Sequence, residues 1–174
     1  MEVYLTDKAF LSIVLSGIEV YRDEVLGVLL GYELVDGDMV VEYAIPYQTA
    51  KRSKREVEPI RHREIRVLNI SDRLTNFNHL GYFHSHTEFR GERGVAELSE
   101  IDKESLDEGK IELIISINDA KRKFSWRCSD TDIYGSIDKF HIHLACFKRE
   151  SKGKIMRVQI SCPYILGLSE LYEL

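Results

Sequence analysis

The chain has 174 residues, which fits one domain with a sizeable hydrophobic core. Hydrophobic residues make up 44% and charged residues 30% of the sequence, as in ordinary soluble globular proteins. The net charge of −5 argues against nucleic acid as a partner, and no apolar run approaches the roughly 20 residues that span a membrane. The first residues show no basic region followed by an apolar one, so we expect no signal peptide.

The chain contains three cysteines, Cys128, Cys146 and Cys162. Their number is odd, their spacing is wide and no Cys-x-x-Cys pair occurs, so the sequence predicts no disulfide framework. Because cysteines stay reduced in the cytoplasm, we expect a cytoplasmic location.

A helix and a hairpin are the first elements that the sequence predicts. Thr6 or Asp7 can cap a helix over about residues 7–20. Its apolar residues recur at helical spacing: Phe10, Ile13, Val14 and Ile18. Residues 25–34 are apolar on both faces and indicate a buried strand. Residues 38–47 return as its partner after an Asp-Gly turn.

The middle of the chain alternates between helices and strands. The charged segment 51–60 predicts a loop or flap, and a second helix then ends near residues 76–78. The apolar residues of that helix are Ile65, Leu68 and Leu74. A strand over 79–86 follows, then a short helix over 99–109 closed by a glycine, and then a buried strand over 111–118.

The last third of the chain is predicted to be mostly strands. A turn at 119–121 leads into 123–128, and two late strands occupy about 137–148 and 154–162. The tail, 165–174, fits either a strand or a helix. No repeat and no second domain are visible, so we expect one mixed α/β domain over residues 1–174, with a curved, mostly antiparallel sheet and helices on its faces.

Two histidines one residue apart, His84 and His86, are the first candidate site. Residues i and i+2 of a strand point to the same face, so both imidazoles can converge on one metal ion. A polar strand end facing solvent is the alternative for such a pair taken alone. A second pair, His141 and His143, alternates with apolar residues and is followed by no Ser-x-x-Asp, so we interpret it as structural, facing solvent or a partner.

Three further polar residues are candidates for the same chemistry. Ser99 and Asp102 form Ser-x-x-Asp at a helix start, which resembles a capping box, and Asp102 also suits zinc as a third ligand. Glu24 precedes a buried strand and can serve as a base for a metal-activated water. An exposed acid at a helix–strand junction is its alternative interpretation.

Together these separated parts match one family pattern. Glu-x-x-Gly-x-Leu-x-Gly begins at Glu24, His-Ser-His spans 84–86, and Ser-x-x-Asp spans 99–102. In this order the parts resemble the JAMM motif of the JAB1/MPN/Mov34 metalloproteases. The order of helices and strands also resembles that family over roughly residues 5–130, with further strands and a tail over 131–174.

The resemblance implies a fold, a reaction and a role for each residue. The fold would be a single MPN-like, cytidine-deaminase-like domain. His84, His86 and Asp102 would bind zinc, Glu24 would be the general base that later protonates the leaving amine, and Ser99 would hydrogen-bond the oxyanion. The enzyme would be a zinc isopeptidase that removes ubiquitin or a ubiquitin-like modifier from a lysine, acting alone or within a homo- or hetero-oligomer.

Two departures from the family leave the substrate open. Thr87 stands where the family often has proline, and the gap over residues 87–98 is longer than usual. Extra loop residues are tolerated because closure entropy grows slowly with loop length. The alternatives are a non-catalytic MPN scaffold, a peptidase acting on a sulfur-carrier protein, and the DNA-repair-associated RadC branch. Ser85, where that branch is expected to have asparagine, and the acidic net charge disfavour the last.

Charged residues near the site have simple explanations. Acids in and beside the long gap can meet a basic substrate tail, although a solvated loop is the favoured explanation for them: Glu88, Glu92, Glu97 and Glu100. The basic run 51–55 lacks interleaved aromatic residues, so we interpret it as a solvated loop and not as an RNA site.

Overall fold

The computed structural model describes residues 1–52, 57–88, 91–151 and 153–170. Its helices are α1 (Asp7–Glu19), α2 (Arg61–Leu74), α3 (Glu100–Ser105) and α4 (Tyr164–Glu170). Its strands are β1 (Glu2–Leu5), β2 (Leu26–Glu33), β3 (Met39–Pro46), β4 (Lys51–Arg52), β5 (Val57–Glu58), β6 (Asn78–Thr87), β7 (Ile111–Asp119), β8 (Arg127–Cys128), β9 (Asp132–Ile137), β10 (Phe140–Arg149) and β11 (Ile155–Ser161).

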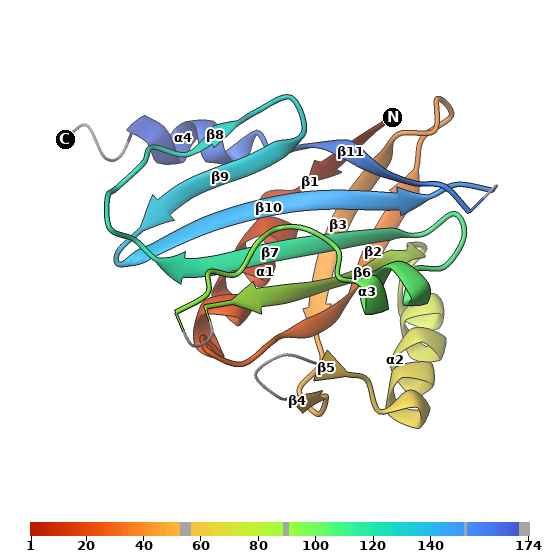
Figure 1. Ribbon diagram of the computed structural model, residues 1–174. Coiled ribbons are helices and arrows are strands. Elements are labelled where there is room, and N and C mark those ends of the chain that lie inside the picture. The colour runs from red at the N-terminus through yellow and green to blue at the C-terminus, as the bar shows by residue number, and fades with distance from the viewer. Residues whose placement is uncertain (53–56, 89–90, 152, 171–174) are drawn as a thin grey trace.

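Seven of the described strands close into a barrel in the order β11-β1-β3-β2-β6-β7-β10 (Figure 1). Strand β10 has two successive partners on one side. Its first part, Phe140–Ala145, pairs with β9, and its last part, Cys146–Arg149, pairs with β11 and so closes the ring. Strand β1 lies parallel to β3 and to β11, and β6 lies parallel to β7.

The predicted curved sheet with helices on its faces, and with it the MPN-like domain that the resemblance implied, is wrong. The β10–β11 pairing turns the sheet into a barrel, and β1 beside β11 joins the two ends of the chain, with Glu2 opposite Gln159. Local apolar patterns identify strands, but they do not specify which distant strands pair. Closure depends on such distant pairs, so the sequence pattern did not reveal it.

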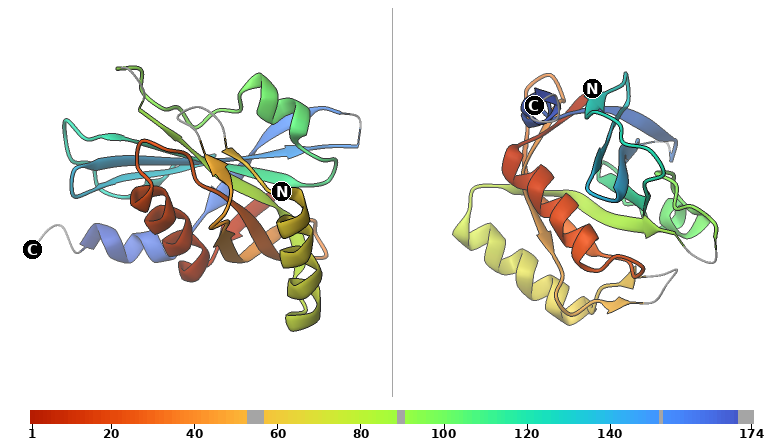
Figure 2. Two further views of the ribbon diagram at one scale, coloured as in Figure 1. Left: turned by 90° about the horizontal axis from the view of Figure 1, so that it is seen from below. Right: turned by 90° about the vertical axis from the view of Figure 1, so that its left-hand side faces the viewer.

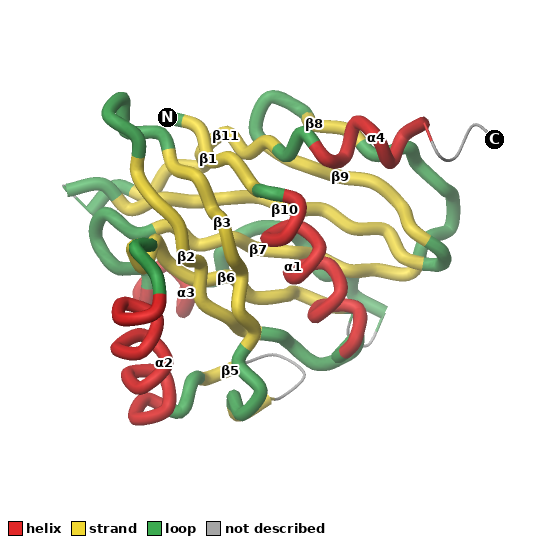
Figure 3. The backbone as a smooth tube through the Cα atoms, turned by 180° about the vertical axis from the view of Figure 1, so that it is seen from behind, coloured by secondary structure: helices red, strands yellow, loops and turns green. Residues whose placement is uncertain are grey.

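Helix α1 lies along the back of the barrel and covers its main core (Figure 3). The Thr6 side chain caps the helix by accepting a hydrogen bond from the backbone N–H of Ala9. The apolar face of α1 packs into the same cluster as the core-facing side chains of the barrel strands. The helix contributes Phe10, Ile13 and Val14 to this cluster.

Helix α2 lies on the other face of β2, beside the barrel (Figure 2). Val67 and Leu68 pack against a smaller cluster of β2 side chains, Leu26, Val28 and Leu30. Neighbouring residues of β2 therefore face two different cores, which explains why the strand is apolar on both faces.

Several element boundaries differ from the expectations. Helix α2 ends at Leu74, and α3 stops at Ser105 although the pattern extended to 109. Strands β1 and β9 were not predicted, and only the last two residues of 123–128 form a strand. The tail forms α4 up to Glu170, and of the basic run only β4 is described, because 53–56 lie outside the described residues. No helix among the residues described is long and apolar enough to cross a membrane.

Candidate metal centre

Strand β6 holds His84 and His86 on the face opposite the main core. Between them Ser85 is fully buried, and Phe83 on the same side belongs to the main core. The Ser85 hydroxyl accepts a hydrogen bond from the Val25 N–H at 2.9 Å, and the Ser85 N–H donates to the Val25 carbonyl at 3.0 Å. This pair of bonds fixes the backbone next to Glu24, so the residue between the histidines also positions the predicted base.

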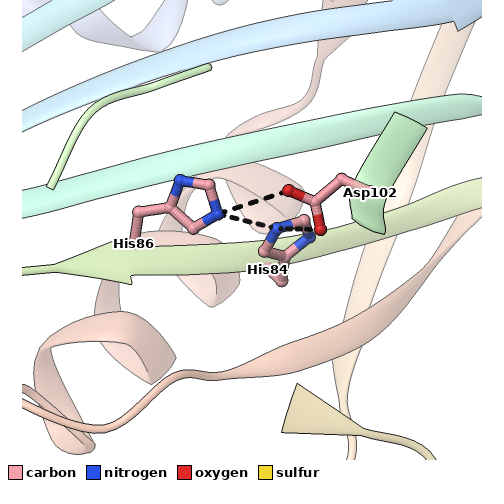
Figure 4. A group of neighbouring side chains, drawn as sticks. All are labelled: His84, His86 and Asp102. Carbon is pink, nitrogen blue, oxygen red and sulfur yellow. Dashed lines mark hydrogen bonds and ion pairs between the residues drawn. The ribbon is translucent and has the colours of Figure 1, made fainter. Parts of the chain in front are cut away.

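Helix α3 brings Asp102 to the histidines (Figure 4). Ser99 caps the helix: its hydroxyl accepts from the Asp102 N–H at 3.2 Å, and its own N–H donates to Asp102 Oδ2 at 2.7 Å. Asp102 is therefore both a member of the capping box and the predicted third ligand. Asp102 is held rigidly, with Oδ1 3.3 Å from His84 Nε2 and Oδ2 3.6 Å from His86 Nε2.

The three predicted ligands form a group of metal-binding size. One ligand atom from each of His84, His86 and Asp102 lies within 4.8 Å of the other two. The two Nε2 atoms are 3.0 Å apart. In the sequence these residues are separated by up to 18 positions. The structure brings them together on one outer face of the barrel.

Hydrogen bonds on the far side of each ring determine which nitrogen faces the centre. His86 Nδ1 lies 2.9 Å from the Val95 carbonyl oxygen, which only accepts, so Nδ1 carries the proton. His84 Nδ1 lies 2.7 Å from the Glu112 carboxylate and donates to it in the same way. Both Nε2 atoms thus point toward Asp102, and a carboxylate behind a metal-binding histidine strengthens it as a ligand.

Electrostatics at this point favour a cation. In neutral histidines with protonated Nδ1, two Nε2 lone pairs and the Asp102 oxygens converge, which is unfavourable unless a positive charge lies among them. Without a metal, a proton on His84 supplies part of this positive charge. Burial lowers the pKa of His84, but hydrogen bonds to Asp102 and Glu112 outweigh burial and raise the pKa to about 10. A zinc ion, which prefers histidine nitrogen and carboxylate oxygen, fits the same donor set.

A cavity of about 390 Å³ opens onto the three ligands. Glu24 and Ser99 line it together with the ligands and Glu112. Glu24 is only 8% exposed, so it is not the exposed junction acid of the alternative interpretation. The apolar part of the cavity wall is formed by Leu26, Tyr82 and Ile101. Every residue with a predicted catalytic or ligand role therefore borders one space.

The long gap before Ser99 is anchored close to the histidines. Asn118 of β7 accepts from the Gly94 N–H at 2.8 Å and donates to the Gly94 carbonyl at 3.0 Å. A Cβ at Gly94 would lie 2.4 Å from the His86 carbonyl oxygen, so this contact requires glycine. Residues 91–98 of the gap thus return along the end of β6 and deliver Val95 to His86.

The second histidine pair has other partners. His143 Nε2 lies 2.7 Å from Asp132 Oδ2, and Arg157 of β11 binds both oxygens of the same carboxylate, at 2.8 and 2.7 Å. His143 is therefore part of an ion-pair network between strands. His141 lines a different cavity.

Sequence reasoning missed three supporting residues: Ser85, Glu112 and Asn118. Glu112 offered a signal, because it is a charged residue within the otherwise apolar run 111–115. In the structure it is only 7% exposed. The parallel pairing of β6 and β7, which brings Glu112 beside the histidine strand, was not visible in the sequence.

Comparisons with known proteins bear on the fold. No family model matches the chain, and no curated protein matches it. The solution structure of a protein from Desulfitobacterium hafniense is similar, with a TM-score of 0.64, 19% identity and 92% of each chain covered. Another, from Salinibacter ruber, has a TM-score of 0.54 and 19% identity over 87% of this chain and 86% of that chain. At these identities the likeness shows a shared fold alone.

Proposed function

We propose that this protein is a zinc-dependent peptidase of the JAMM type of chemistry, acting as an isopeptidase on the amide bond that follows ubiquitin or a ubiquitin-like modifier. The observation that carries the proposal is the convergence of His84, His86 and Asp102, with Glu24 and Ser99 on the wall of the same cavity. Two aligned imidazoles and one carboxylate leave a coordination position for water, as catalytic zinc sites do.

The chain's own residues have distinct roles in this proposal. Bound zinc would supply Lewis acidity that activates a water and polarises the amide carbonyl. Glu24 takes the proton of the attacking water and delivers it to the leaving amine nitrogen. The Ser99 hydroxyl donates to the oxyanion that develops on the carbonyl oxygen. Glu112 and the Val95 carbonyl keep both imidazoles oriented throughout.

The JAMM motif suggests that the substrate is the extended tail of a ubiquitin-like modifier. An extended substrate tail can bind by strand addition, but β6 is already paired on both sides, with β2 and β7. The small β4–β5 ribbon is the nearer edge, because Pro59, which directly follows β5, lines the cavity. A tail paired with this ribbon would lead its scissile bond toward Glu24.

A sulfur-carrier peptidase and a non-catalytic scaffold are the competing proposals. A peptidase acting on a sulfur-carrier protein would use the same residues on another tail. A non-catalytic scaffold subunit has no need for the buried Glu24 or the oriented histidines. For location we propose the cytoplasm, since Cys128, Cys146 and Cys162 are all free thiols.

Metal analysis and cleavage assays on two variants test the proposal. The purified protein should carry close to one zinc per chain, and His86→Ala should lose it, because one of three protein ligands is removed. Glu24→Gln should keep zinc but lose cleavage of ubiquitin-like fusions, by a factor of about 10²–10⁴, because the proton acceptor is gone.

The second histidine pair supplies the control. His141 and His143 have the same one-residue spacing as His84 and His86 but lie outside the cluster. His141→Ala should therefore leave zinc content and cleavage at wild-type levels. Unchanged zinc in His86→Ala would disprove the metal centre, and full cleavage by Glu24→Gln would remove Glu24 from its role. Zinc binding with no cleavage of any ubiquitin-like or sulfur-carrier fusion would favour the scaffold.

A further inference from the structure

A second cavity, of about 460 Å³, lies where β7 ends and β10 begins. Its wall carries four cationic side chains, Arg93, Lys121, Arg122 and Arg127. Its other lining residues are aromatic or small, with Phe124, Tyr134 and His141 supplying the rings. The volume is that of a small-molecule site, which typically measures roughly 300–1,000 Å³.

The charge of this wall contrasts with the rest of the chain. The net charge is −5, yet no carboxylate lines the cavity. None of the four cations forms an ion pair with another residue of the described ranges. Like charges without nearby acids repel one another, so such a wall favours a bound anion. Three of the four cations are guanidinium groups, which favour phosphate because each can bind two of its oxygens.

The aromatic residues offer a planar surface beside the cations. Phe124 is 46% exposed, and its ring centroid lies 5.4 Å from that of His141. The Arg127 guanidinium lies over the Tyr134 ring, 4.5 Å from its centroid, which orients the cation at the cavity. Exposed rings next to a cationic patch suit a ligand that joins a flat ring to an anion.

His141 contributes a neutral ring to the wall of this cavity. His141 Nδ1 is buried and makes no hydrogen bond within the described structure. Burial and the nearby Arg93 lower the pKa of His141, so the ring is neutral at neutral pH. Because Nδ1 is closed to solvent, His141 contributes its uncharged ring to the cavity wall and offers no hydrogen bond from this atom.

We propose that this cavity binds a small phosphate ester of a planar ring, a ligand of the nucleotide type. The cations take the phosphate, and the ring of the ligand stacks on Phe124 beside the neutral ring of His141. The site lies on the same outer face as the metal centre but shares no lining residue with it. The inference therefore stands whether or not the proposed peptidase activity is correct.

Calorimetric titration with AMP tests the proposal at low ionic strength, with adenosine and inorganic phosphate as partial ligands. AMP should bind about tenfold more tightly than either, since each offers only part of the contacts. The doubly substituted Arg122→Glu/Arg127→Glu should weaken AMP binding about 100-fold, through the loss of charge-assisted bonds. Phe124→Ala should weaken AMP binding but leave phosphate binding unchanged.

Matched controls separate the cavity from general charge and from the metal centre. Arg66→Glu/Arg73→Glu makes the same change in net charge on exposed positions of α2, and should bind AMP normally. His86→Ala should also bind AMP normally, which excludes phosphate bound at the metal. Circular dichroism of each variant confirms folding.

Several results would overturn the proposal. Inorganic phosphate binding as tightly as AMP would mean an adventitious anion only. Equal losses in the α2 control would assign the effect to overall charge. A short single-stranded oligonucleotide binding far more tightly than AMP, and lost in Arg122→Glu/Arg127→Glu, would assign this surface to nucleic acid instead.

Discussion

Glu112 shows how one residue behind a ligand can control a metal centre. It is only 7% exposed, and its carboxylate receives the Nδ1 proton of His84 at 2.7 Å. Without that acceptor the His84 ring is free to turn or to change its protonated nitrogen, and Nε2 is no longer held toward Asp102. The charge of Glu112 also makes His84 a stronger donor to a cation.

Substitutions at Glu112 should separate these two effects. Glu112→Ala should weaken zinc binding by about 10–100-fold, because both the acceptor and the charge are lost. Glu112→Gln should weaken it less, because the amide oxygen still accepts from Nδ1. Competition with a chromophoric chelator measures both affinities. Glu104→Gln, an exposed acid on α3, is the matched control and should bind zinc as the wild type does.

At the scale of elements, the segment between β6 and α3 connects all three ligands. Asn118 binds the Gly94 backbone on both sides, and Gly94 lies against the His86 carbonyl. Arg157 also contacts Glu97 in the same segment. The extra length over 87–98 is therefore compatible with the ligand set, because its described second half is anchored to strands β7 and β11.

Gly94→Ala tests this anchoring. The new Cβ would meet the His86 carbonyl oxygen at 2.4 Å, and the three nearest atoms are all backbone, so the segment must move. We expect a loss of about 1–3 kcal/mol in the free energy of unfolding, as for other overpacked sites, together with weaker zinc binding. Gly167→Ala on α4, where no atom lies within 4 Å of the new Cβ, should keep wild-type zinc affinity and should not lower stability. Wild-type zinc affinity in Gly94→Ala would contradict the anchoring.

At the scale of the whole molecule, the strands that close the barrel are linked by ion pairs as well as by backbone bonds. Asp132 of β9 binds Arg157 of β11 and His143 of β10. Burial raises the pKa of Asp132, but the hydrogen bonds from Arg157 and His143 outweigh burial and hold that pKa below its usual range. An unfolded aspartate titrates near about 3.9, so the stabilisation is present above this pH and is lost as pH falls through the lower folded pKa.

Asp132→Asn should therefore have an effect that depends on pH. At pH 7 the variant should be less stable than the wild type by about 1–3 kcal/mol, because charge-assisted bonds become neutral ones. Below about pH 4 the difference should shrink, because protonation of Asp132, first in the unfolded and then in the folded protein, removes the charge that the network uses. Urea denaturation at pH 7 and pH 3 measures it. Exposed Asp130→Asn should show little change at either pH, and a constant Asp132→Asn effect would refute the assignment.

The local elements and the candidate ligands were largely accessible from the sequence. Helix α1 begins at Asp7 after its Thr6 cap, and β2, β3, β6 and β7 lie within one or two residues of their predicted bounds. His84, His86 and Asp102 lie together as the motif predicted, although their role in binding metal stays a prediction. Such features depend on alternation, helical spacing and capping, which neighbouring residues specify.

Only the tertiary structure decided the rest. The barrel closes because β1 joins β3 to β11 and because β10 changes partner partway along its length, and no local pattern specifies either pairing. The same long-range pairing brings Glu112 behind His84, the Gly94 segment beside His86, and four cations around the second cavity. The sequence by itself determined which side chains have the chemistry for a metal centre. Packing between distant strands determined what orients them, because those contacts are chosen by the energy of the whole fold and not by adjacent residues.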